Sequence, residues 1–113
     1  MSERDRRVAE NQSIFRDVNE LRPVSGEEAT VEFLCECGLT DCDERIALVP
    51  AEYESVRVDS RQFVIRHGHE LLENEDVVSR DERFLVVRKF GEAGEVADER
   101  DSRSSAAGRR PDR

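Results

Sequence analysis

The sequence has no tryptophan, one tyrosine, five phenylalanines and no long apolar run. Of its 113 residues, 36% are hydrophobic and 40% are charged, which predicts one domain with a modest core. No stretch approaches the roughly 18 apolar residues that a membrane-spanning helix needs. No apolar run follows Met1, so we expect no secretory signal and a cytoplasmic location.

Cysteine is also scarce, and acidic residues outnumber basic ones by 27 to 18. Three cysteines cannot all pair within one chain, which argues against a disulfide scaffold and fits a reducing cytoplasm. The net charge is −9, and residues 23–96 carry 18 acidic side chains against 8 basic ones. Such a surface repels phosphate backbones, so we expect no nucleic-acid binding. We expect instead a protein partner, for which a basic surface would be complementary, with no membrane and no small-molecule substrate.

The soft metal ligands are gathered in two short segments. Cys35, Cys37 and Cys42 lie within eight residues, and both histidines, His67 and His69, lie within three. Zinc binds thiolate sulfur and imidazole nitrogen, and four protein ligands close its structural sites. The pattern therefore predicts one zinc ion that joins the two segments, with either histidine able to supply the fourth ligand. Free thiols, and an iron–sulfur cluster that would normally need a fourth cysteine, are weaker alternatives.

Apolar spacing predicts an N-terminal amphipathic helix over residues 4–21. The residues on its apolar arc are Val8, Ile14, Phe15, Val18 and Leu21. This arc would cover the core or, alternatively, bind a partner or a second copy of the chain.

Alternating apolar residues predict a strand over 29–35, and short apolar runs predict strands over 45–49, 62–66, 77–80 and 83–90, with a short helix over 50–56. The Cys35–Cys42 segment would be the turn of a β-hairpin. Residues 91–96 would form a last helical turn. The class is α+β, with a small antiparallel sheet built on a zinc-knuckle β-hairpin. We expect a single zinc-stapled domain over 1–96, in which 1–22 hold the N-terminal helix, and a disordered tail over 97–113.

The chain resembles a group of small uncharacterised bacterial proteins over roughly residues 6–97. Four segments carry most of the resemblance, namely 33–38 (FLCECG), 41–46 (DCDERI), 50–57 (PAEYESVR) and 68–70 (GHE). In that group Gly-His-Glu recurs, whereas a histidine at the place of His67 does not. The resemblance implies that the ligand set is Cys35, Cys37, Cys42 and His69. It implies no activity.

The charges near the cysteines indicate what a zinc ion would do there. Three thiolates and one imidazole leave a bound zinc with a net charge of −1, and the acids Glu36, Asp41, Asp43 and Glu44 are its neighbours in sequence. Such a closed, anionic zinc is a poor Lewis acid, so we expect a structural zinc and no enzyme activity. The sequence thus predicts a zinc-stapled interaction or regulatory module. A zinc-thiolate redox sensor is the alternative, and a small metal-dependent hydrolase is a weaker one.

Overall fold

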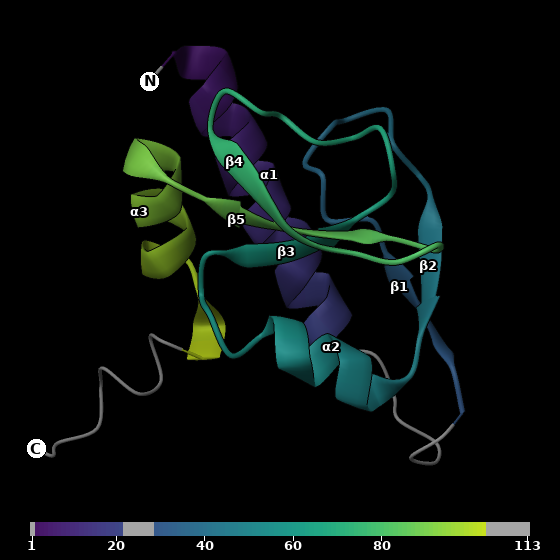
Figure 1. Cartoon of the computed structure of the whole chain (residues 1–113). Helices are drawn as coiled ribbons and strands as arrows, with labels where there is room; N and C mark the ends of the chain where they lie inside the picture. The colour runs from purple at the N-terminus through teal and green to yellow at the C-terminus, as the bar shows by residue number, and fades with distance from the viewer. Residues whose placement is uncertain (1, 22–28, 104–113) are drawn as a thin grey trace, which may run out of the picture.

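The computed structural model of the protein describes residues 2–21 and 29–103. Over these residues the chain forms three helices and five strands (Figure 1). In chain order they are α1 (Glu3–Glu20), β1 (Val31–Leu34), β2 (Arg45–Leu48), α2 (Pro50–Val56), β3 (Gln62–Ile65), β4 (Glu75–Arg80), β5 (Leu85–Lys89) and α3 (Gly91–Glu99). The predicted α+β class, the N-terminal helix and the short second helix are confirmed. The sequence also predicts a turn at residues 25–27, and these lie outside the described residues.

The strands form two small antiparallel sheets rather than one. β1 pairs with β2 as a hairpin, and the other three strands have the order β3-β5-β4. One backbone hydrogen bond of 2.8 Å, from Glu36 N to the Val64 carbonyl, joins the segment after β1 to β3. The sheets stay separate because the chain turns after Leu34 into the cysteine segment. The acidic composition of residues 71–76 predicts irregular structure, but β4 already begins at Glu75. Its pairing with β5 is shifted by one residue at Val78.

The core lies between the two sheets and α2. Phe33 of β1 stacks on Tyr53 of α2 with ring centroids 4.4 Å apart. The central strand β5 places Leu85, Val86 and Val87 in the interior. Residues in or next to the strands that are buried in this core include Phe33, Ile46, Leu48, Phe63, Ile65, Phe84 and Val86. Val31 is partly buried at the margin of this cluster.

Helix α1 packs against the sheets with a face that is mostly polar. Its buried residues are Val8, Ala9, Gln12, Ser13, Arg16 and Asn19. The expectation that the whole apolar arc covers the core is wrong, because Ile14 is 52% exposed, Val18 40% and Leu21 82%. Among the described residues, no helix combines the length and the apolar composition needed to cross a membrane.

Hydrogen bonds explain why the polar face of α1 is buried. The Arg16 guanidinium donates to the carbonyls of Ser60 (2.5 Å) and Ala97 (2.9 Å) and lies over the Phe63 ring. The Asn19 side chain both accepts from Leu34 N (2.8 Å) and donates to the Leu34 carbonyl (3.0 Å). These side chains satisfy backbone groups that would otherwise be buried without partners, which an apolar face could not do.

The ordered chain continues past the expected domain limit at residue 96. Helix α3 extends to Glu99, Ala97 is buried, and the buried Asp101 pairs with Arg57, the C-cap residue of α2. Arg103 then binds carboxylates of α1 and α2. The limit therefore falls inside α3. The rest of the expected tail, residues 104–113, lies outside the described residues.

These contacts predict different results for two truncations. Ending the chain after Val96 removes Asp101, so the buried Arg57 keeps Glu20 but loses its second carboxylate. The same truncation removes the Ala97 carbonyl that accepts from Arg16 and the ion pairs of Arg103, and together these losses cost about 3–5 kcal/mol. We expect the melting temperature to fall by at least about 10 °C. Ending the chain after Arg103 keeps these contacts and is the matched control. Equal melting temperatures for the two truncated proteins would show that the C-terminal contacts do not stabilise the fold.

Candidate metal centre

The three cysteines lie in the connection between β1 and β2. Cys35 N donates to the Glu44 carbonyl (3.1 Å), so the hairpin continues one step beyond the strands, and Cys42 N donates to the Leu39 carbonyl (3.1 Å) to close the loop. Gly38 turns the chain between them with a φ of +81°, which strongly favours glycine. A Cβ atom at this position would also lie 2.4 Å from the Val8 carbonyl of α1. The loop is therefore curled and pressed against the helix.

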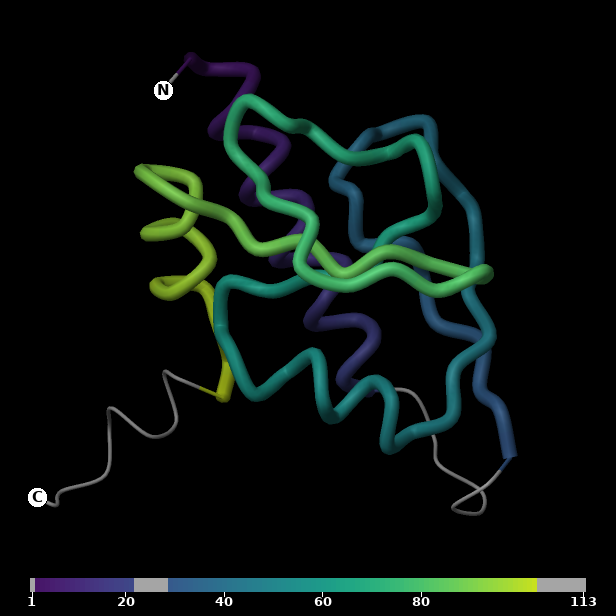
Figure 2. Tube along the Cα trace, in the orientation of Figure 1, coloured from purple at the N-terminus to yellow at the C-terminus, as the bar shows by residue number. Residues whose placement is uncertain are grey.

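The histidine segment follows β3. Gly68, with a φ of +88°, bends the chain directly after the strand. The backbone N–H of His69 donates to the Arg66 carbonyl (3.2 Å), and the Glu70 carboxylate accepts from Gly68 N (2.9 Å). Each residue of the Gly68-His69-Glu70 motif thus has a local role in this turn. The turn brings His69 next to the cysteine loop, and the two segments lie side by side in Figure 2.

Four side chains from the two segments meet at one point. His69 Nδ1 is 3.4 Å from Cys35 Sγ and 3.6 Å from Cys42 Sγ. With Cys37 included, the four ligand atoms all lie within 4.8 Å of one another. The cysteines are free thiols, of which Cys35 and Cys37 are buried and Cys42 is half-buried. The structure thus brings together the four residues expected from the sequence, in a cluster that could hold a metal ion.

The second histidine lies elsewhere. His67 is exposed, and its Nε2 is 2.6 Å from the Asp81 carbonyl in the β4–β5 turn. Both histidines follow the same strand, but the bend at Gly68 separates them. Only His69 faces the thiols.

The thiols differ in how easily they lose a proton. The hydrogen bond from Cys35 lowers the pKa of Cys37 to about 5, and the same bond raises the pKa of Cys35. Burial raises the pKa of Cys42. Cys35 Sγ also accepts the backbone N–H of Arg66 at 3.2 Å. A single thiolate is therefore stable in the cluster, whereas three would repel one another unless a cation bound between them.

Glu36 has a role that the sequence analysis missed. We expected its carboxylate near the metal, but it is fully buried on the opposite side of the segment. It accepts from Tyr53 Oη (2.6 Å), Asn19 Nδ2 (2.9 Å) and Val64 N (3.1 Å). Burial raises its pKa. The signal was available in the Cys-x-Cys spacing, because alternate residues of an extended segment point to opposite sides.

The outer side of the cluster is acidic and reachable. A hollow of about 230 Å³ is lined by Leu39, Asp41, Cys42, Asp43, Glu44 and His69. Asp41, Asp43 and Glu44 are exposed, as expected from the sequence. The buried thiols of Cys35 and Cys37 do not line this hollow.

Replacing each histidine in turn should show which of the two is a metal ligand. His69→Ala should weaken zinc binding by at least about 100-fold, because loss of a ligand should cost no less than loss of a supporting contact. His67→Ala is the control and should leave zinc affinity within a few-fold of the unchanged protein. Competition with a zinc-binding dye would measure both. Equal losses would contradict the assignment of His69.

Replacing Glu36 should test the buried side of the same segment. Glu36→Ala removes the acceptor of three buried donors and should lower the free energy of unfolding by about 3–5 kcal/mol. Glu32→Ala, at an exposed position of β1, is the control and should change it by less than about 0.5 kcal/mol. Urea denaturation would measure both. Similar values would show that the Glu36 hydrogen bonds contribute little.

Comparisons of the chain with protein-family models, with curated proteins and with solved structures find no match. The resemblance seen in the Gly-His-Glu and Cys-x-Cys segments therefore stays a prediction. Any function has to be argued from the residues and the geometry described above.

Proposed function

We propose that the protein is a small, non-enzymatic zinc protein of the cytoplasm, in which a structural zinc ion stabilises a protein-interaction or regulatory module. The observation that carries the proposal is the convergence of Cys35, Cys37, Cys42 and His69 within 4.8 Å. These are all the cysteines of the chain and one of its two histidines.

The spacing of the cluster supports zinc as the metal. With Zn–S bonds of about 2.3 Å and Zn–N bonds of about 2.0 Å, a tetrahedral ion places neighbouring sulfur and nitrogen ligands about 3.5 Å apart. The distances from His69 Nδ1 to Cys35 Sγ and Cys42 Sγ are 3.4 Å and 3.6 Å. Thiolate and imidazole are ligands that bind zinc well, whereas magnesium and calcium prefer oxygen ligands.

The ligand count supports a structural role over a catalytic one. Four protein ligands fill a tetrahedral zinc, whereas a hydrolase keeps one position for water. The charged residues that line the outer hollow are Asp41, Asp43 and Glu44, which would repel an anionic substrate or a developing oxyanion. The hydrolase alternative therefore has less support than the structural one.

Two features support an intracellular interaction module. The three cysteines are free thiols in a cluster, which suits a reducing compartment. The exposed apolar side chains Ile14, Val18 and Leu21 recur at helical spacing along α1, as they do on helices that bind partners.

One observation favours a redox sensor as the second candidate. Cys42 is half-buried and lines the outer hollow, so dissolved peroxide could reach its sulfur. Two zinc-bound thiolates would give two electrons to one hydrogen peroxide, which would take two protons from water; a disulfide and two waters would form, and zinc would leave. Zinc release by dilute peroxide at a rate well above that of unfolding would favour this candidate over a purely structural site.

Metal removal should unfold the whole domain. Structural zinc can supply on the order of 10 kcal/mol of apparent binding free energy, which is comparable to the entire stability of a small domain. Cys42→Ser, or a chelator at neutral pH, should therefore collapse the amide dispersion of the NMR spectrum in both sheets. The control is the same chelator saturated with zinc. A metal-free protein that keeps its spectrum and its melting temperature would contradict the proposal.

A further inference from the structure

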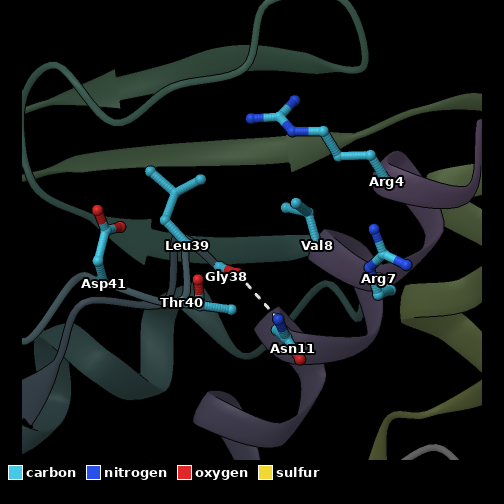
Figure 3. Close-up of a pocket in the computed structure, with 8 residues that line it drawn as sticks. All are labelled: Arg4, Arg7, Val8, Asn11, Gly38, Leu39, Thr40 and Asp41. Carbon is cyan, nitrogen blue, oxygen red and sulfur yellow. Dashed lines mark hydrogen bonds between the residues drawn. The ribbon is translucent and has the colours of Figure 1, made fainter.

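A groove separates the first turns of α1 from the tip of the cysteine loop (Figure 3). Its volume is about 370 Å³, and its lining residues are Arg4, Arg7, Val8, Asn11, Gly38, Leu39, Thr40 and Asp41. The arginines come from the helix, and Leu39, Thr40 and Asp41 come from the loop. Asn11 Nδ2 donates to the Gly38 carbonyl at 3.2 Å and ties the two walls together.

Among the described residues, the two arginines of the groove have no acidic partner. Within residues 2–21 and 29–103, neither Arg4 nor Arg7 makes an ion pair or a side-chain hydrogen bond, although the chain has 27 acidic and 18 basic side chains. Arg57, Arg83 and Arg103 each bind carboxylates instead. Arg4 and Arg7 are one helical turn apart, and guanidinium groups bind carboxylates through paired hydrogen bonds. These two guanidinium groups are therefore available to an outside anion, while Asp41 makes the opposite wall of the groove acidic.

The same surface of α1 becomes apolar farther along the helix. Arg7, Asn11, Ile14 and Val18 follow one another at spacings of three and four residues, which places them on one continuous face. Ile14 is 52% exposed and Val18 40% exposed. From Arg7 to Val18 the helix rises about 16 Å, which about five residues of extended peptide would span.

We propose that the groove and this face of α1 bind one extended segment of a partner protein, with carboxylates against Arg4 and Arg7 and apolar side chains against Ile14 and Val18. The inference rests on the proposed function, because the loop wall of the groove lies between two proposed zinc ligands, Cys37 and Cys42. It also refines the partner expected from net charge, since this surface selects an acidic segment where the whole chain would favour a basic one.

A peptide segment fits these features better than a small anion does. Exposed ion pairs contribute little on their own, so a lone anion at Arg4 and Arg7 would bind weakly. The apolar side chains of Ile14 and Val18 would add no binding free energy for such an anion. A segment that covers both regions gains from the charge pairs and from burial of apolar area.

The test is an NMR titration of the zinc-loaded protein with a capped eight-residue peptide that carries two glutamates at one end and two leucines at the other. We expect saturable shifts in the amides of Gly38–Asp41 and of the first four turns of α1. The double variant Arg4→Gln/Arg7→Gln should raise the dissociation constant about tenfold, in line with the loss of two exposed charge pairs. Arg45→Gln/Arg80→Gln is the control. It removes the same charge from exposed arginines that make no ion pair within the described residues, and it should change the constant less than twofold.

A second variant, a second peptide and a competition with phosphate distinguish the proposed site from the alternatives. The variant Ile14→Ala/Val18→Ala keeps the helix and should weaken binding of the same peptide. A peptide with lysines in place of the glutamates should not shift the amide signals of the groove. Inorganic phosphate that competes fully with the peptide would mean an anion site only and would overturn the proposal. So would equal affinities in the two arginine variants. Zinc content is measured in every sample. A protein that binds the peptide without zinc would overturn the proposed function but not the proposed peptide-binding site.

Discussion

The buried carboxylate of Glu36 is the contact on which the arrangement of the domain depends. It accepts hydrogen bonds from α1 through Asn19, from α2 through Tyr53 and from β3 through Val64. Cys35 and Cys37 flank it in sequence and point to the opposite side, into the metal cluster. One short extended segment therefore holds a candidate metal site on its outer side and connects three elements of the fold on its inner side.

This arrangement links the metal site to the rest of the domain without a long chain of contacts. A change in the position of Cys35 or Cys37 must also move the Glu36 carboxylate, because the three residues are adjacent. Moving that carboxylate would leave the Tyr53 hydroxyl and the Val64 N–H buried without an acceptor, which is costly in a region of low dielectric constant. The small apolar core cannot compensate for such a loss. Binding at the cluster and folding of the domain are therefore expected to be a single event.

Much of this structure could be predicted from the sequence because it depends on local pattern. Alternation and short apolar runs located the strands, and the clustering of cysteines and histidines located the candidate site. The buried face of α1 could not be found in that way, since apolar periodicity pointed to Ile14 and Val18 and not to Arg16 and Asn19. Those polar residues are buried because unpaired carbonyls and N–H groups of distant segments face them, and no local signal in the sequence reveals these partners. The separation of the strands into two sheets is equally non-local.

The cysteine segment also covers the free edge of β3. Glu36 N donates to the Val64 carbonyl, the Glu36 carboxylate accepts from Val64 N, and Cys35 Sγ accepts from Arg66 N. An uncovered strand edge presents a row of donors and acceptors to any other extended chain, and β3 is rich in apolar residues. Loss of the metal would then do more than loosen the domain, because it would expose an edge suited to intermolecular strand pairing. By covering this edge, the cysteine segment occupies a position at which another extended chain could otherwise pair with β3.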